Sequence, residues 1–160
     1  MRWSLGVGFA VVGLLAGCGD SQRNAFVCPA SEGHSVVQPF NGRLVALGRP
    51  PIYVRIDNRG DLRRGVVALG LTDFPGWFAV KTHFFSVRGY DGPVRVHVKR
   101  IDRRGAARLG NAPTDGSTFS APTVGDQPVF TWMRAPGCYR WSISSRGFHE
   151  TVVIRATAHE

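Results

Sequence analysis

The residues best suited to chemistry stand at the end of an apolar run near the start of the chain. Leu5 to Ala16 is apolar apart from glycines, and the run closes on Leu15-Ala16-Gly17-Cys18 before the chain turns polar. A cysteine thiolate is a good nucleophile, so Cys18 can be alkylated. The small residues just before it leave the backbone open to a peptidase. The pattern indicates modification of one sulfur atom, coupled to cleavage beside it.

The length of this run distinguishes an export signal from a membrane span. A span needs roughly 20 apolar residues, and Leu5–Ala16 is much shorter and follows the positive charge of Arg2. Both features are typical of a secretory signal peptide. Its end resembles the bacterial lipobox, whose cysteine receives diacylglycerol, becomes the first residue and is then acylated. The resemblance implies a lipoprotein signal peptide over residues 1–17 and lipidation of Cys18. A plain secretory signal and an uncleaved anchor are the alternatives.

The anchoring energetics favour several acyl chains on Cys18. Each buried methylene contributes about 0.8 kcal/mol, and one acyl chain alone binds a membrane only marginally. Two or three chains on one residue hold firmly. We therefore expect membrane lipid as a partner through acylated Cys18, and a place in the bacterial cell envelope facing the periplasm or the exterior. Gly19 is not the acidic residue that signals inner-membrane retention, so the choice of membrane stays open.

The other two cysteines, Cys28 and Cys138, form an even pair once Cys18 carries lipid. In an exported protein such a remainder predicts one disulfide. The bond would close a loop of 138 − 28 = 110 residues, which corresponds to about 4–5 kcal/mol in the chain-entropy account. Zinc binding is not expected, because no CxxC pair or nearby histidine completes a ligand set.

The chain is strongly basic. It has 20 Lys and Arg against 11 Asp and Glu, a net charge of +9 that becomes +8 without Arg2. An exported basic domain can contact anionic lipid headgroups or wall polymers. Nucleic acid is not an expected partner outside the cytoplasm. The basic doublets Arg63-Arg64 and Arg103-Arg104 stand beside glycine in expected turns, which favours solvated turns.

Beyond Cys28 the sequence has the pattern of an all-β protein. Short runs of β-branched and aromatic residues alternate with Gly, Asp, Asn and Pro, as in an antiparallel sandwich or barrel. Along each run apolar and polar residues alternate, which predicts one buried and one wetter face. The expected strands are Ser35–Gln38, Arg43–Leu47, Ile52–Ile56, Val66–Leu71, Trp77–Val87, Pro93–Ile101, Val129–Met133, Cys138–Ser144 and Phe148–Thr157.

Several loose motifs along the mature chain resemble a known family. They are Cys28-Pro29, the NGRL of 41–44, the aromatic strand of 77–85, the stretch 92–102 and the PGCY of 136–139. Together they resemble a family of small, uncharacterised bacterial secreted proteins and lipoproteins. The resemblance implies an immunoglobulin-like β-sandwich of about seven to nine strands over residues 28–160, preceded by a tether at 18–27. It also implies the Cys28–Cys138 pairing, and no activity.

Motifs for catalysis or cofactor binding are absent from the sequence. There is no G-x-S-x-G elbow, HExxH, P-loop, GxGxxG or EF-hand loop. The aspartates fall mainly in expected turns, where Asp serves its own backbone. We therefore expect neither an enzyme nor a cofactor. The loop at 111–126 is rich in Pro, Ser, Thr and Gly, with a short edge strand at Thr118–Ser120 as an option.

One strand offers a candidate ligand face. Trp77, Lys81, His83 and Phe85 alternate along one side of the expected strand 77–87, and neighbouring strands could bring His97 beside them. Aromatic residues on both sides of a strand indicate either two covered faces or an exposed ring surface for a glycan or protein partner. Burial under a loop or the N-terminal segment is the alternative. Two histidines without a third ligand do not make a metal site.

The leading hypothesis is a non-enzymatic lipoprotein whose sandwich acts as an envelope interaction or structural module. The runner-up is a periplasmic lipoprotein that binds a small ligand, a glycan or a metal. A cavity lined by Trp77, His83, Phe85 and His97 would favour the runner-up.

Overall fold

The computed structural model describes residues 26–38, 42–57, 60–87, 90–122 and 125–158. The predicted signal peptide, the lipidation site Cys18 and most of the predicted tether lie outside these residues. None of the helices among them is both long and apolar enough to cross a membrane.

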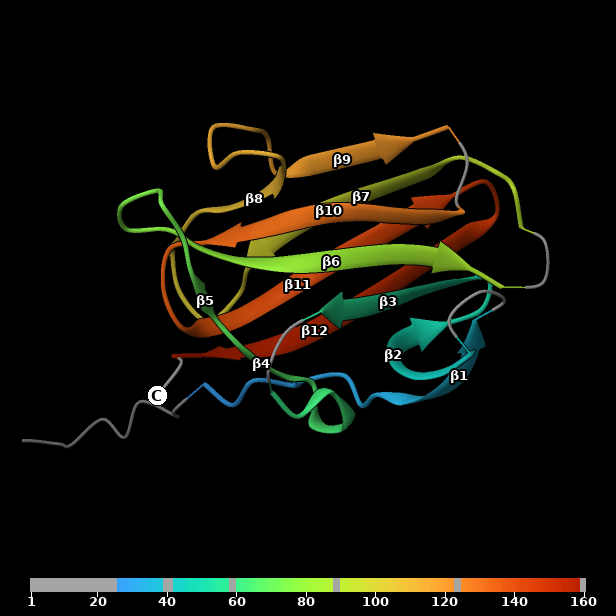
Figure 1. Cartoon of the computed structure of the whole chain (residues 1–160), viewed down its shortest axis with the longest axis horizontal. Coiled ribbons are helices and arrows are strands. Elements are labelled where there is room, and N and C mark those ends of the chain that lie inside the picture. Colours follow the sequence, from blue (N-terminus) through green and yellow to red (C-terminus); the bar gives the residue numbers. More distant parts are fainter. Residues whose placement is uncertain (1–25, 39–41, 58–59, 88–89, 123–124, 159–160) are drawn as a thin grey trace, which may run out of the picture.

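Two sheets pack face to face (Figure 1), which confirms the prediction of an all-β sandwich. Neighbouring strands are antiparallel except β4 and β12. The seven-stranded sheet contains, in spatial order, β1 (His34–Gln38), β2 (Gly42–Arg49), β3 (Ile52–Asp57), β6 (Phe78–Ser86), β10 (Asp126–Met133) and β8 (Ala107–Gly110), with β5 (Gly70–Leu71) also paired to β6. The five-stranded sheet contains β4 (Val66–Ala68), β12 (Phe148–Thr157), β11 (Gly137–Ser145), β7 (Val94–Arg100) and β9 (Thr118–Ala121).

The core lies between the sheets and follows the predicted alternation. On β7 Val94, Val96 and Val98 are buried while the residues between them are exposed. The largest fully buried side chains come from both sheets, with Trp141 and Tyr139 on β11 facing the layer that holds Phe84 on β6. The period of two in the sequence therefore sets the inner face of each strand correctly.

The strand inventory differs from the prediction in two places. The expected strand Val66–Leu71 is two strands, since β4 pairs with β12 in one sheet and β5 with β6 in the other. The strand β8 was not predicted, because its four residues, ARLG, lack a β-branched or aromatic run. The edge strand within 111–126 is present as β9. Twelve strands are described, which exceeds the expected seven to nine.

The predicted disulfide between Cys28 and Cys138 is confirmed, with the two Cα atoms 5.6 Å apart. It joins the segment before β1 to the start of β11. Two hydrogen bonds between Ser31 and Val153 continue this attachment along β12. The Ser31 N–H donates to the Val153 carbonyl at 2.8 Å, and the Val153 N–H donates to the Ser31 hydroxyl oxygen at 2.9 Å. The start of the described chain is thereby fixed to the edge of the five-stranded sheet.

A buried ion pair closes the same end of the sandwich. Arg100, the last residue of β7, points inward and donates to both oxygens of Asp102 at 2.7 and 3.1 Å. Its guanidinium also lies over the Tyr139 ring and donates to the carbonyl of Pro136. The Arg100 hydrogen bond outweighs burial, so the pKa of the Asp102 carboxyl lies below its ordinary value.

The β1–β2 hairpin folds back over the outer face of the seven-stranded sheet. Gln38 on β1 bonds to Asp126 on β10, although β2, β3 and β6 separate these strands in the sheet. A second, smaller core forms under the hairpin from Val36, Ala46, Tyr53 and Phe85, with Leu44 and Val87 at its margin. This face therefore has its own hydrophobic cover.

Candidate functional site

The structure brings together only part of the predicted ligand face. Lys81, His83 and Phe85 lie on the outer side of β6, as the alternation predicts. Phe85 is fully buried beneath the β1–β2 hairpin, where its ring stacks on Tyr53. Trp77 precedes the strand, and its half-buried ring lies 4.2 Å from the Arg134 guanidinium carbon. An N-proximal segment thus covers Phe85, which is the alternative that the sequence left open.

His97 does not belong to this face, and its predicted grouping with His83 is wrong. His83 is on β6 of the seven-stranded sheet, and His97 is on β7 of the five-stranded sheet. Both point outward, so they lie on opposite surfaces of the sandwich. The connection between the two strands crosses from one sheet to the other, whereas the prediction treated them as neighbours. Trp77, His83, Phe85 and His97 therefore do not line one cavity.

His83 is the centre of a polar network on the covered face. Its Nδ1 lies 2.7 Å from Oδ1 of Asp126, and its Nε2 lies 2.8 Å from Oδ2 of Asp57. Arg55 stands beside both, with Nη2 at 3.1 Å from His83 Nε2 and a hydrogen bond to Asp57 Oδ2 at 3.2 Å. Four charged or titratable side chains from β3, β6 and β10 therefore meet at one point.

Gln38 closes the network into a ring. Its amide nitrogen donates to Asp126 Oδ2 at 3.1 Å, and its amide oxygen accepts from Arg55 Nη1 at 3.2 Å. Gln38 is 4% exposed and His83 is 6% exposed, so the hairpin shields both from water. The ring pins the end of β1 onto β3 and β10.

The neighbours of Asp57 change the affinity of its carboxyl for a proton. Burial acts to raise the pKa of the Asp57 carboxyl, but the Arg55 hydrogen bond and the charges of His83 and Arg55 outweigh it. The pKa of Asp57 therefore lies below its ordinary 3.8.

The geometry of the network favours a structural role over catalysis. Both ring nitrogens of His83 face a carboxylate within 2.8 Å, so the ring offers no free atom to a substrate. Across the described ranges, no group of three His, Cys, Asp or Glu residues is placed to hold a metal ion. The ring ties four strands together.

This network corrects one reading of the sequence. The sequence pattern predicts turns at Asp57 and Asp126, where each would serve its own backbone, but they end β3 and begin β10 and bind side chains of other strands. Asp115 behaves as predicted, since its Oδ2 accepts from the backbone N–H of Ala112. No local signal separates these cases, because His83, the partner that Asp57 and Asp126 share, lies far from both in sequence.

The outer face of the five-stranded sheet differs in charge. Its five strands hold a single acidic residue, Glu150. The alternation along β12 places Glu150 on the inward side, and it binds Arg49. Most of the outward positions are basic or hydroxylic, with Cys138 and Val153 as buried exceptions. The basic and hydroxylic residues are Arg95, His97 and Lys99 on β7, Arg140, Ser142 and Ser144 on β11, Thr118 and Ser120 on β9, and His149, Thr151 and Arg155 on β12. We call this surface, with the exposed Arg103, Arg104 and Arg146 in its flanking turns, the cationic face.

One end of the cationic face is hollowed into a basic cleft. The cleft has a volume of about 480 Å³ and lies between β11 and the turn that follows β7. The basic side chains on its wall, apart from the Asp102-bound Arg100, are Lys99, Arg103, Arg104 and Arg140. Within the described part of the chain none of these four forms an ion pair, and the buried Nε of Arg140 has no acceptor. We call the hollow lined by these residues the basic cleft.

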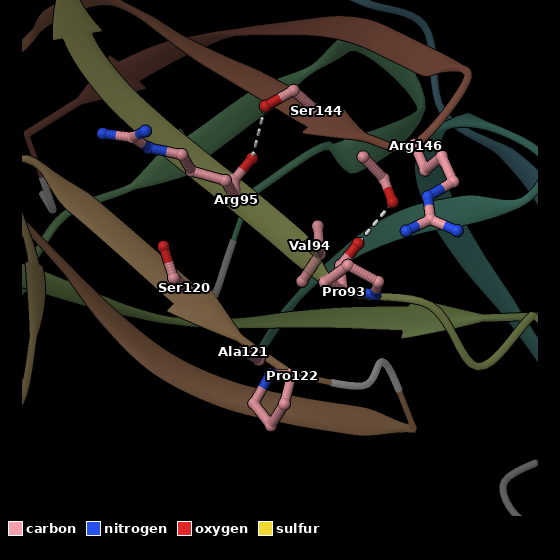
Figure 2. A pocket seen from close by; sticks show the side chains of 9 residues that line it. Pro93, Val94, Arg95, Ser120, Ala121, Pro122, Ser144 and Arg146 are labelled. Carbon is pink, nitrogen blue, oxygen red and sulfur yellow. Dashed lines mark hydrogen bonds between the residues drawn. The ribbon is translucent and has the colours of Figure 1, made fainter.

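A second hollow, of about 560 Å³, lies at the opposite end of the same face (Figure 2). Pro93, Val94, Ala121 and Pro122 give it apolar walls. The hydroxyls of Ser144 and Ser145 donate to the carbonyls of Arg95 and Pro93, so they are occupied within the protein. The guanidinium groups of Arg95 and Arg146 point away from each other in Figure 2 and do not converge on one point.

No protein-family model matches this sequence, and no curated protein shows significant sequence similarity to it. Among solved structures, the chain is similar to the cupredoxin domain of amoB from Nitrosocaldus yellowstonii, with a TM-score of 0.31 and 13% sequence identity. The alignment covers 51% of this chain and 56% of that domain, so the chain spans about half the length of the structure it matches. Similarity at this level assigns no role to any residue.

Proposed function

We propose that the protein is a membrane-anchored bacterial lipoprotein whose β-sandwich is a non-catalytic interaction module of the cell envelope. Cys18 carries the lipid, and the sandwich holds a binding surface close to the membrane. The proposal combines the sequence pattern at residues 15–18 with the arrangement of cysteines in the fold.

The observation that carries the proposal is the Cys28–Cys138 disulfide. It uses both of the other cysteines in the chain, which leaves Cys18 without a disulfide partner in its own chain. Disulfides persist in oxidising compartments outside the cytoplasm. A single remaining cysteine at the end of an export signal is the arrangement that lipidation requires, and a plain secretory signal has no need of it.

The fold also supports a short distance between the domain and the membrane. Nine residues lie between Cys18 and Cys28, and ten extended steps span at most about 35 Å. Because the disulfide ties Cys28 to the start of β11, this end of the sandwich is held near the bilayer when Cys18 is anchored. The partners of the module are therefore membrane lipid and molecules close to the membrane, such as an envelope protein or a glycan.

A second candidate, a lipoprotein that binds a small ligand, draws on the hollow in Figure 2. Its apolar walls and flanking arginines suit a small molecule with an anionic group. The diverging arginines make it the weaker candidate.

The proposal is tested with the Cys18→Ser variant in a bacterial host. Serine has nearly the same size but lacks the nucleophilic sulfur. We expect the wild type to incorporate a labelled fatty acid, to start at residue 18 and to partition into detergent. The variant should incorporate no label and should not be cleaved at the same bond. Cys28→Ser/Cys138→Ser is the matched control, because it removes two other sulfurs and should keep the lipid. A Cys18→Ser variant that still matures at that bond and stays with membranes would overturn the proposal.

A further inference from the structure

We propose that the basic cleft docks onto the phosphate groups of anionic phospholipids, so that the cationic face rests on the membrane that carries the anchor. The occupant is an anionic bilayer surface. The proposal rests on the lipid anchor proposed above for the orientation of the domain, and on the charge of the cleft for the contact.

Like charges lie opposite each other on two adjacent strands of the cationic face. Lys99 on β7 and Arg140 on β11 are register partners, and both point outward. Like charges directly opposite each other destabilise a sheet. No carboxylate of β7, β9 or β11 offsets this pair, because these strands contain no Asp or Glu. The arrangement costs stability in the free protein, and an external anion would relieve that cost.

The basic cleft presents several cations to one ligand. The turn after β7 adds exposed Arg103 and Arg104 to the same cleft, which gives four basic side chains around one hollow. Arg100 does not count, because Asp102 neutralises it. Arginine guanidinium groups suit phosphate oxygens in particular, since they donate in a planar fork. The complementary partner is therefore a surface with several phosphates.

The basic cleft lies close to the start of the described chain, which leads to the anchor. Phe26 and Val27, where the described chain begins, share a hollow of about 450 Å³ with Arg103 and Arg155. In Figure 1 this start lies at the same end of the sandwich as the described C-terminal end. Seven residues lie between positions 18 and 26, and eight extended steps span at most about 30 Å. Anchored lipid at Cys18 therefore brings the basic cleft to the headgroup layer.

Two exposed apolar side chains favour a bilayer over a soluble polyanion as the partner. Phe26 is 52% exposed and Val27 is 77% exposed, and both stand beside the cations. Apolar side chains next to a basic cluster favour the membrane interface, where rings and aliphatic groups insert between headgroups. A dissolved acidic polymer would leave them in water.

The test uses the processed, lipid-bearing protein in vesicles of phosphatidylcholine, with and without about 30% phosphatidylglycerol. Hydrogen exchange is measured at the backbone amides of the turn 103–105 and of Val27 and Cys28. The amides of η1 (Leu62–Arg64), which lies outside the cationic face, serve as an internal reference. We expect slower exchange in the turn only on anionic vesicles, and loss of this protection at about 0.5 M salt, where charges are screened over a few ångströms.

Two triple variants separate the cleft from overall charge. The cleft variant is Lys99→Gln/Arg103→Gln/Arg104→Gln. The control variant is Arg43→Gln/Arg63→Gln/Arg64→Gln, which removes the same charge from exposed residues outside the cationic face. Each cation near an anionic surface strengthens binding about fivefold, so the cleft variant should lower the ratio of docked to undocked protein about a hundredfold. The control should dock like the wild type.

Each result decides a separate question. Equal exchange on both kinds of vesicle, with the protein still floating with the vesicles in high salt, would overturn the docking and leave the anchor intact. Failure to float, with no lipid on Cys18, would overturn the anchor, and binding of the same protein to anionic vesicles would then measure the cleft directly. Protection by soluble poly(glycerol phosphate) but not by anionic vesicles would also overturn the proposal, in favour of an acidic wall polymer.

Discussion

The two outer faces of the sandwich carry similar residue types in different surroundings. Basic side chains have acidic partners on one face and lack them on the other. On the seven-stranded sheet, Arg55 and His83 meet Asp57 and Asp126. The β1–β2 hairpin covers His83, and its Gln38 bonds to Asp126. On the five-stranded sheet the strands offer basic side chains without acidic partners, and no second hydrophobic cluster covers this face in the described residues.

The difference shows what separates a structural histidine from a surface histidine. His83 and His97 both occupy outward positions of a central strand, at the same period of two. His83 is buried because acidic partners and a hairpin stand over it. His97 is exposed, and its ring lies within hydrogen-bonding distance of the hydroxyls of Ser117 and Thr118. Charge balance and cover from other strands, rather than the strand's own sequence, decide the role.

The largest effect is expected from the aromatic residue beneath the hairpin. Phe85→Ala should lower the free energy of unfolding by about 3–5 kcal/mol, because it empties the centre of the second core. Phe130→Ala, at a position that is 39% exposed, is the matched control and should cost much less. Urea denaturation of both variants measures the difference. Equal losses would mean that the hairpin does not seal the covered face.

A smaller effect is expected from substituting the two histidines, one on each outer face. His83→Ala leaves Asp57, Asp126 and Arg55 with unsatisfied groups in a partly buried site, and should cost about 1–3 kcal/mol. His97→Ala should change stability by less than about 0.5 kcal/mol, as for other exposed substitutions. Thermal unfolding of the two variants compares the faces residue for residue. A costly His97→Ala would contradict the assignment of the cationic face as open surface.

The comparison also shows what the sequence could and could not predict. Alternation placed Val94, Val96 and Val98 inward correctly, and cysteine counting predicted the disulfide. Both rest on local periodicity or on composition. The network around His83 joins residues from four strands, so it depends on strand order and on the folding back of the hairpin. Hydrophobic periodicity carries no information on strand order or on the folding back of the hairpin. The lack of strand order also explains why the predicted grouping of His83 with His97 is wrong.

Acid should lower the stability of the covered face by protonating Asp57. Its pKa is below 3.8 in the folded protein, so it adds stability above about pH 4 that is lost as the pH falls through the lower, folded value. The stability difference between the wild type and Asp57→Asn should therefore shrink from pH 6 to pH 2.5. Asp91→Asn, at an exposed position, is the control. Chemical denaturation across this range measures both, and a gap that does not change with pH would argue against the Arg55–Asp57 pair.

The smallest effect is expected from neutralising the cationic face. The Lys99→Gln/Arg103→Gln/Arg104→Gln variant should stay within about 0.5 kcal/mol of the wild type, because the three side chains are exposed and have no ion-pair partner in the described part of the chain. A slight gain would fit the removal of repulsion between Lys99 and Arg140. Differential scanning calorimetry at low salt measures it. A loss of several kcal/mol would show that these cations serve the fold.

The intact mass of the protein purified from membranes tests the lipid anchor most directly. Mass spectrometry after alkylation of free thiols should give a chain that begins at Cys18 and carries diacylglycerol on its sulfur, with Cys28 and Cys138 still oxidised to each other. A mature chain that lacks lipid on Cys18, or that begins at another residue, would contradict the account.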